Sequence, residues 1–296
     1  MVAVVGATAT GKSDLALDLA EALDGAIGNA DASQLYRGMD IGTAKVPVEQ
    51  RRGIPHHQLD VLEVTDEASV AAYQVQARAD LAAIRVAGRR PLVVGGSGLY
   101  VRALLDRLEI PPTDESVRAR WETALAERGV ADLYAELARR DPVAAARIEP
   151  RNGRRIVRAL EVIELTGRPF SATMPSRELV EPTVLVGLRA PRPVLDARIA
   201  ERVRGMWRAG LLDEVAALDA LGLRRGRTAS RALGYAQALA QLDGALDEEQ
   251  AQEQTVQATR RFARRQEAWF GADPRVRWLE HDAPGLLDRA LALTPA

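Results

Sequence analysis

The sequence predicts an α/β fold in which helices cover both faces of a parallel sheet and an all-helical segment is inserted. Short apolar runs alternate with stretches of helical spacing, which is typical of parallel sheets. The first apolar run, Val2–Gly6, leads through a glycine-rich loop into a helical stretch. Between residues 111 and 177 strand signals are almost absent, and this predicts the inserted helices.

The core elements follow from periodicity, because buried strands are short apolar runs and helices repeat their apolar residues at one-turn spacing. The expected strands are Val2–Gly6, Gly25–Ala30, Pro91–Gly96, Thr183–Leu188 and Arg275–Leu279. The expected core helices are Lys12–Leu23, Ala68–Ala87, Pro191–Ala209, Asp213–Leu221 and a long one near Glu248–Phe270.

The inserted segment is bracketed by helix-breaking residues, PPTD at 111–114 and GRPFSATMPS at 167–176. Within it, helices are expected over Ser116–Glu127, Ala131–Arg139 and Arg154–Leu165. The expected division is therefore a catalytic core of residues 1–110 and 178–296 and a helical insertion of residues 111–177.

Composition excludes several classes of protein. A chain of 296 residues, 47% hydrophobic, can bury a sizeable core in one large domain or two linked ones. The absence of cysteine excludes disulfides, thiol nucleophiles and cysteine-bound metal, and three histidines favour no histidine-rich metal site. No apolar run reaches the roughly 20 residues that cross a bilayer, and no signal-like segment precedes the first strand. We expect a cytoplasmic protein without membrane association.

Positive charge comes almost entirely from arginine, since lysine occurs only at Lys12 and Lys45. An ammonium is compact and a guanidinium is planar, so a retained lysine can mark a position that requires the compact cation. The motif around Lys12 supports this interpretation, whereas chance explains Lys45 equally well. Because the net charge is −1, contact with nucleic acid would need local basic patches.

The strongest functional signal is GATATGKS, which matches the phosphate-loop pattern G-x-x-x-x-G-K-[ST] in full. It follows a predicted strand and opens a predicted helix, so its N–H groups and the helix N-terminus would cradle an anion. Lys12 would bridge phosphate oxygens and Ser13 would bind Mg²⁺. The expected phosphate-binding residues are Gly6, Ala7, Thr8, Ala9, Thr10, Gly11, Lys12 and Ser13.

The second, acid-ended strand of motor and switch NTPases is missing. The best apolar strand ends in Gly95–Gly98, and the nearest candidate acid is Asp31, after the second strand. In a doubly wound sheet that strand end lies at the ligand-binding edge. The loop is therefore expected to hold a diphosphate that departs, and not a triphosphate that drives motion.

An ordered series of motifs resembles the bacterial tRNA dimethylallyltransferases over nearly the whole chain. The series is GATATGKS at 6–13, Asp31–Lys45, Ile54–His57, Gly95–Tyr100, Ser230–Tyr235 and Ala258–Gln266. The resemblance implies a P-loop kinase-like fold and transfer of a dimethylallyl group from dimethylallyl diphosphate to N6 of tRNA adenosine 37. It also implies Mg²⁺ as cofactor, and no phosphoryl transfer.

The same resemblance implies roles for individual residues. Asp31 would be the general base, with water-mediated Mg²⁺ binding or a turn cap as the open alternatives, and Lys12 and Arg202 would contact the diphosphate. The implied tRNA contacts are Asp31, Ala32, Ser33 and Gln34 beside the adenine, Ser97 where the family commonly has Thr, Arg118 in the insertion, and Arg231. We further expect a monomer.

Two basic stripes predict contacts with RNA phosphates. Arg151, Arg154, Arg155 and Arg158 recur at one face of a predicted helix, and Arg260, Arg261, Arg264 and Arg265 lie on the last long helix. In a family that handles an anticodon stem-loop, both stripes are interpreted as phosphate contacts, with Arg154, Arg155 and Arg158 as tRNA-binding residues. The histidines receive no such role: His56 and His57 are expected to order a loop, and His281 to be exposed.

Three alternatives remain open at this stage. A P-loop small-molecule kinase would keep GATATGKS but would not explain the arginine stripes. A prenyltransferase acting on free adenine nucleotides would need no insertion that binds an anticodon stem. A nucleic-acid-binding ATPase or regulator would need an acid at the end of a strand such as PLVVGG, which is absent.

Overall fold

The computed structural model describes residues 1–173 and 177–294, so the last three residues of the predicted breaker segment 167–176 lie outside the described residues. Its core is a six-stranded sheet of order β3-β2-β4-β1-β5-β6, in which every neighbouring pair is parallel. The strands are β1 Val2–Gly6, β2 Gly25–Asn29, β3 His56–His57, β4 Arg90–Gly95, β5 Val184–Arg189 and β6 Val276–Glu280. The central β1 carries the phosphate loop to the ligand-binding edge of the sheet.

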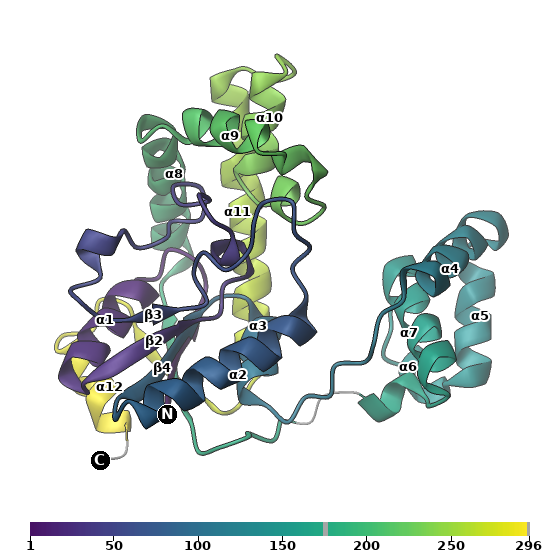
Figure 1. The fold of residues 1–296 in the computed structure, drawn as a ribbon, viewed down its shortest axis with the longest axis horizontal. Helices are drawn as coiled ribbons and strands as arrows, with labels where there is room; N and C mark the ends of the chain where they lie inside the picture. The colour runs from purple at the N-terminus through teal and green to yellow at the C-terminus, as the bar shows by residue number, and fades with distance from the viewer. Residues whose placement is uncertain (174–176, 295–296) are drawn as a thin grey trace. The chain divides into compact units, whose positions relative to one another are not determined.

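Helices cover both faces of this sheet, as predicted (Figure 1). On one face lie α1 (Lys12–Ala22) and α12 (Leu286–Leu293), whose apolar residues pack against Val4 and Leu92. On the other face lie α2 (Val70–Val86), α3 (Gly98–Leu105) and α11 (Glu248–Gly271). The strands β1, β2, β4 and β5 are largely buried, which explains why their sequences are continuous apolar runs and not alternating ones.

A second helical layer is built onto α11. It consists of α8 (Arg192–Arg208), α9 (Leu211–Ala220) and α10 (Tyr235–Leu242), with the short 3₁₀ turns η4 (Leu223–Arg225) and η5 (Ala229–Arg231). Leu195, Ile199, Val203 and Trp207 form the buried face of α8 at helical spacing. The rest of the α8 surface therefore remains available for charged side chains, and Arg202 lies on it beside the buried face.

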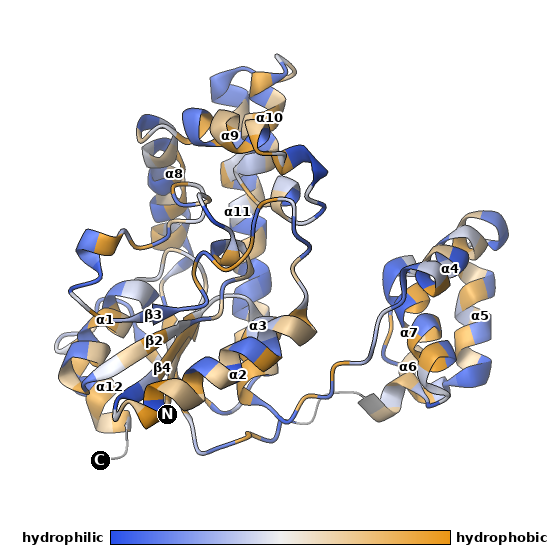
Figure 2. Cartoon of the chain, in the orientation of Figure 1, coloured by the Kyte–Doolittle hydropathy of each residue, from blue (hydrophilic) through white to orange (hydrophobic). Residues whose placement is uncertain are grey.

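The insertion is a compact unit of its own, Asp106–Val180. Its elements are α4 (Glu115–Arg128), α5 (Val130–Arg140), α6 (Pro142–Ala145), α7 (Gly153–Thr166) and the 3₁₀ turn η3 (Phe170–Thr173). Hydrophobic and hydrophilic residues alternate along these helices (Figure 2), and Leu133, Leu137, Ile156 and Leu160 form their shared core. The α4 helix begins where Asp114 accepts a hydrogen bond from the Val117 N–H.

Several elements were not predicted: the short helices α3, α10 and α12, and three elements that lack a local signal. The two-residue strand β3 is defined by pairing with Ile27 and Gly28, and the 3₁₀ turns η1 (Ala32–Leu35) and η2 (Val48–Gln50) are too short for periodicity. The expected exposure of His281 was wrong. Its backbone N–H donates to the Arg189 carbonyl beside the sheet, and its side chain is only 6% exposed. Among the described helices none is both long and apolar enough to cross a membrane.

Candidate active site

The phosphate loop is closed tightly between β1 and α1. Gly6 has φ +139°, and a Cβ there would lie 2.4 Å from the Leu188 carbonyl oxygen; Gly11 has φ +91°. Both positions therefore require glycine. The Thr10 hydroxyl donates to the Ala7 carbonyl at 2.8 Å, which holds the two sides of the loop together.

Lys12 lies along this loop. Its Nζ donates to the Ala7 carbonyl oxygen at 2.6 Å. Burial, with a smaller effect of the nearby Arg202 cation, lowers the pKa of Lys12 to about 8, while Asp31 opposes the shift. Among the described residues no carboxylate forms an ion pair with Lys12, so its charge is left largely uncompensated.

Arg202 brings a second cation to the loop from α8. Its Nη1 donates to the Thr8 hydroxyl at 3.2 Å. Burial lowers the pKa of Arg202, and the positive charge of Arg198 one turn away lowers it further. The negative charge of Asp14 partly opposes this shift. Two cations, neither of which forms an ion pair with a carboxylate in the described part of the chain, thus contact a loop whose backbone can cradle an anion.

Asp31 follows β2 and caps η1, its Oδ1 accepting the Ser33 N–H at 3.0 Å. Burial raises the pKa of Asp31, while the bond from Ser33 and the charge of Lys12 oppose that rise. Its backbone is fixed by Asn29, whose Oδ1 accepts the Asp31 N–H at 3.0 Å and whose Nδ2 donates to the Asp31 carbonyl. The carboxylate is therefore held in place and has a raised proton affinity, as a general base requires.

Two tyrosines, Tyr73 and Tyr100, lie near Asp31. The Tyr73 hydroxyl donates to the Asn29 carbonyl at 2.8 Å, and its ring packs 4.8 Å from that of Tyr100. Burial, with smaller effects of Tyr36 and Asp31, raises the pKa of Tyr100 to about 12. Both phenols are thus neutral near pH 7, and Asp31 is the ionisable group suited to accept a proton here.

The Gly95–Gly98 loop is joined to the Asp31 loop. The Ser97 Oγ accepts the Ala32 N–H at 3.2 Å, and the Ser97 N–H donates to the Ala30 carbonyl. Gln34, the last residue of the expected adenine-contacting segment, instead donates from Nε2 to the Thr43 carbonyl at 3.1 Å. The structure thus brings Ser97, Ala32 and Asp31 together.

Gln266 on α11 was not singled out from the sequence, but it connects two of these loops. It is 4% exposed; its Oε1 accepts the Thr8 N–H at 2.8 Å and its Nε2 donates to the Gly96 carbonyl at 2.9 Å. It lies in the Ala258–Gln266 motif, yet nothing local indicates a partner 258 residues earlier.

The segment 36–45 is held by two charged side chains, the buried Lys45 and the half-buried Glu214. Lys45 Nζ donates to Asp40 and Asp60, each at 2.6 Å, and to the Tyr36 carbonyl at 2.9 Å. The Glu214 carboxylate, also missed from the sequence, accepts the Ile41 N–H at 2.8 Å and the Tyr235 hydroxyl at 2.5 Å. Lys45 is therefore a structural lysine that satisfies three acceptors with one compact ammonium.

In the insertion, the basic face predicted for α7 is divided. Arg154 and Arg155 are exposed, whereas Arg158 donates to the Pro111 and Pro112 carbonyls and, at 2.9 Å, to the buried Glu161. Arg118 also donates twice to Glu161, at 3.0 and 3.2 Å. Periodicity predicted the spacing correctly but could not reveal the buried carboxylate that engages two of the predicted tRNA contacts.

Arg118 and Arg158 in turn fix the charge of Glu161. Burial alone would raise the pKa of Glu161, but the bonds from Arg158, the Asp114 N–H and Arg118 hold it below the ordinary value. The network joins the start of the insertion, residues 111–114, to α7. It gives Arg118 and Arg158 a structural role, and their contact with tRNA stays a prediction.

The remaining basic residues differ in exposure. Arg231 at the end of η5 is exposed, as are Arg261, Arg264 and Arg265 on α11. Arg260 is instead half-buried and lies 3.7 Å from Asp196. The second stripe is thus reduced to three exposed arginines.

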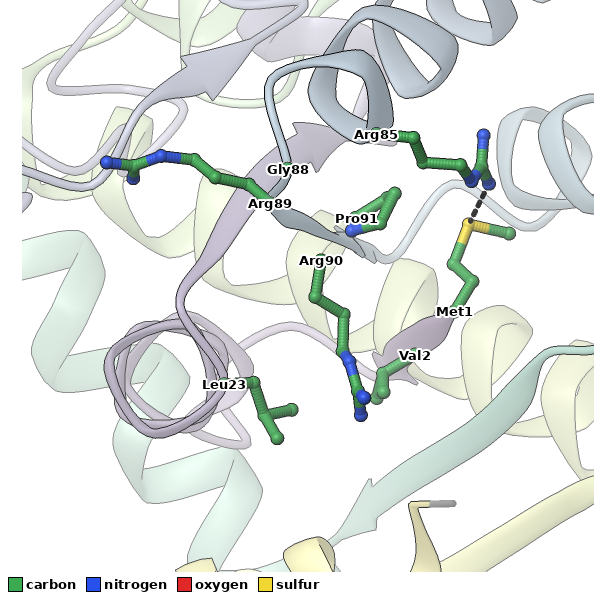
Figure 3. Close-up of a pocket in the computed structure, with 8 residues that line it drawn as sticks. All are labelled: Met1, Val2, Leu23, Arg85, Gly88, Arg89, Arg90 and Pro91. Atoms are coloured by element: carbon green, nitrogen blue, oxygen red, sulfur yellow. Dashed lines mark hydrogen bonds between the residues drawn. The ribbon is translucent and has the colours of Figure 1, made fainter. Parts of the chain in front are cut away.

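A hollow of about 480 Å³ lies elsewhere, at the amino ends of β1 and β4 (Figure 3). It is lined by Met1, Val2, Leu23, Arg85, Gly88, Arg89, Arg90 and Pro91. The phosphate loop and Asp31 follow the carboxyl ends of their strands, so this hollow lies at the opposite edge of the sheet.

The residues at the phosphate loop fit a magnesium ion that is held mainly by a substrate. In the described ranges no three His, Cys, Asp or Glu side chains gather as a metal site. Ser13 offers a hydroxyl at the first turn of α1, beside Lys12. Mg²⁺ typically keeps several waters and binds few protein ligands plus phosphate oxygens, which suits this donor set.

Comparisons with known proteins agree on one family. The model of the family described as IPP transferase matches residues 34–273. A tRNA dimethylallyltransferase of Thermobifida fusca is 62% identical over 99% of this chain and 93% of its own length, and one of Nocardioides is 58% identical over 100% and 96%.

Solved structures agree with the sequence relatives. The tRNA isopentenylpyrophosphate transferase of Bacillus halodurans aligns with a TM-score of 0.69 and 37% identity, over 99% of this chain and 98% of that one. A eukaryotic dimethylallyltransferase acting on tRNA aligns with a TM-score of 0.79 and 25% identity, over 95% and 73% of the two chains. The chain therefore belongs to the IPP transferase family.

Proposed function

We propose that this protein transfers a dimethylallyl group from dimethylallyl diphosphate to N6 of adenosine 37 in tRNA and releases diphosphate. The full-length relatives named tRNA dimethylallyltransferase support the reaction. The single observation that carries it is a pair of cations, Lys12 and Arg202, that contact the anion-binding loop and form no ion pair with a carboxylate in the described part of the chain, with Asp31 held in place at the end of β2.

The cations stabilise the leaving group. As the bond between C1 of the dimethylallyl group and the diphosphate oxygen breaks, negative charge grows on the diphosphate. Lys12, Arg202 and the loop N–H groups are fixed before the reaction and can stabilise that charge without rearrangement. Mg²⁺ held through Ser13 and the diphosphate oxygens would add Lewis-acid stabilisation of the same leaving group.

Asp31 acts on the acceptor. The exocyclic N6 of adenine is a weak nucleophile and loses a proton as the new C–N bond forms. A carboxylate with a raised pKa, held by Asn29 and Ser33, can accept that proton. The bond formed is N6–C1, the bond broken is C1–O of the diphosphate, and the proton passes to Asp31.

The acceptor is proposed to be an anticodon loop. An adenine stacked in a loop must be extruded to reach a catalytic pocket. Ala32, Ser33, Gln34 and Ser97 would contact the extruded nucleotide, and the exposed Arg154, Arg155 and Arg231 would contact phosphates. Arg118 and Arg158 would contribute through side-chain donors that neither Glu161 nor the Pro111 and Pro112 carbonyls engage.

One assay separates this function from the alternatives. The protein is incubated with dimethylallyl diphosphate and Mg²⁺, and with tRNA, AMP or ATP as acceptor, and each acceptor is analysed by mass spectrometry. We expect one dimethylallyl group on tRNA and none on AMP or ATP. Modification of the free nucleotides alone would indicate the nucleotide prenyltransferase. A phosphorylated small molecule formed with ATP would indicate a kinase.

A further inference from the structure

Gln266 connects the donor side of the candidate site with the acceptor side. Its side-chain Oε1 accepts a hydrogen bond from the Thr8 N–H at 2.8 Å, and its Nε2 donates one to the Gly96 carbonyl at 2.9 Å. From Gly96 the chain continues to Ser97, whose Oγ accepts the Ala32 N–H next to Asp31. A continuous path of covalent and hydrogen bonds therefore runs from the phosphate loop to the general base.

The packing around Gln266 leaves no room for another arrangement. A Cβ on Gly96 would lie 2.2 Å from Gln266 Nε2, and a Cβ on Gly98 would lie 2.2 Å from Trp269 Nε1, one turn further along α11. The two glycines thus let their loop approach the side chains of α11 closely. Because Gln266 is only 4% exposed, water cannot readily replace these bonds, and their loss would leave the Thr8 N–H and the Gly96 carbonyl without these partners.

We propose that Gln266 is a positioning residue that sets the separation between the leaving diphosphate and Asp31. The inference rests on the proposed function, because that separation matters only if the donor carbon and N6 must meet between the two loops. Gln266 itself does not touch the reacting atoms; it acts through Thr8 and through Gly96. A displacement of about 1 Å between reacting groups can cost about 100-fold in rate, while binding of either substrate alone need not change.

Two variants of Gln266 test this role. Gln266→Met keeps the length but removes both bonds, and we expect single-turnover transfer to slow about 10- to 100-fold with little change in either KM. Gln266→Glu keeps an acceptor for the Thr8 N–H, but its carboxylate cannot donate to the Gly96 carbonyl unless it is protonated. Its rate relative to wild type should therefore rise as the pH falls.

The control is Gln252→Met on the same helix, where the amide donates to the exposed Glu248, a bond that should be replaceable without effect. Equal single-turnover rates for the Gln266→Met and Gln252→Met variants would overturn the inference. So would a ratio of Gln266→Glu to wild-type rates that does not change with pH, which also decides the case if Gln266→Met fails to fold. Transfer by the wild type in parallel tests the proposed function separately. Its absence would refute that function and the inference with it, whereas wild-type transfer together with equal rates for the two Met variants would refute the inference alone.

Discussion

Lys45 is buried and Lys12 is half-buried in a chain that uses arginine almost everywhere, but the charges around the two lysines are opposite. Lys45 is neutralised by Asp40 and Asp60 and makes a third bond to a carbonyl. Lys12 contacts a carbonyl, lies near a second cation, and has its pKa lowered to about 8. A buried cation without its own counter-ion is energetically unfavourable unless a ligand supplies the charge. The difference separates a lysine that supports the fold from one kept for an anionic substrate.

The arginines of the insertion extend the same comparison. Arg118 and Arg158 form ion pairs with the buried Glu161, as Lys45 does with its two aspartates. Arg202 instead donates a hydrogen bond to a hydroxyl. Sequence spacing alone treats all these cations alike. Their counter-ions distinguish them.

The largest effect is expected from removing the proposed base. Asp31→Ala should slow the chemical step by about 10²- to 10⁴-fold, because the proton of N6 loses its acceptor. Donor binding should persist, because Lys12 and Arg202 remain. Single-turnover transfer to tRNA and donor titration measure the two quantities; a near wild-type transfer rate would remove Asp31 from the mechanism.

At Lys12, arginine should be nearly as damaging as alanine. The loop holds Nζ 2.6 Å from the Ala7 carbonyl, and a larger planar head would meet both this loop and Arg202. Donor affinity and rate should both fall, since the same contact binds the diphosphate and stabilises its growing charge. If Lys12→Arg keeps most of its activity, the site needs only a positive charge.

The two lysines should also differ in their effect on stability. Lys45→Met leaves two carboxylates without their cation and should lower the free energy of unfolding by about 2 kcal/mol, since the aspartates are partly exposed. Lys12→Met should leave stability unchanged or raise it, because the folded state already disfavours that charge. Urea denaturation of both variants checks this, and an equal loss in both would contradict the comparison.

The pH dependence has a defined sign at each end. Lys12 is charged below its pKa of about 8, so kcat/KM for the donor, which reports on the free enzyme, should fall as the pH rises through about 8. Asp31 must be ionised to act as base, and because its pKa is raised, the acidic limb should lie above the ordinary value of 3.8. Neither limb should survive in the variant that lacks the corresponding group.

The smallest effect is expected from the exposed arginines of α7. Replacing Arg154 and Arg155 by alanine should weaken tRNA binding and reduce the slope of log affinity against log salt by up to about 0.9 for each phosphate that is no longer neutralised. Arg158→Ala should instead destabilise the insertion, because Glu161 loses a partner. Filter binding over a salt series checks the first, and an unaltered slope would mean that Arg154 and Arg155 bind no RNA phosphate.

Local chemistry determined what could be predicted from the sequence. The phosphate loop is contiguous, so GATATGKS identified its glycines, Lys12 and Ser13, and the apolar runs predicted five of the strands in the described sheet. Gln266 escaped notice because its partner Thr8 lies 258 residues away. Glu161 lies at i+3 from Arg158, but that spacing does not reveal that Glu161 is buried or that it also binds Arg118, 43 residues earlier. The insertion was expected over 111–177, whereas the compact unit runs from Asp106 to Val180, where its two connecting segments pair with each other.

The uncompensated charge of Lys12 can be measured directly as protons taken up when the donor binds. With a pKa of about 8 in the free protein, Lys12 is about half protonated at pH 8, and a bound diphosphate should complete its protonation. Calorimetric titration of dimethylallyl diphosphate at pH 8, in buffers of different ionisation enthalpy, counts those protons. The account predicts uptake of about half a proton by the wild type that is absent from Lys12→Met and retained in Lys45→Met. Identical proton uptake by the wild type and Lys12→Met would contradict it.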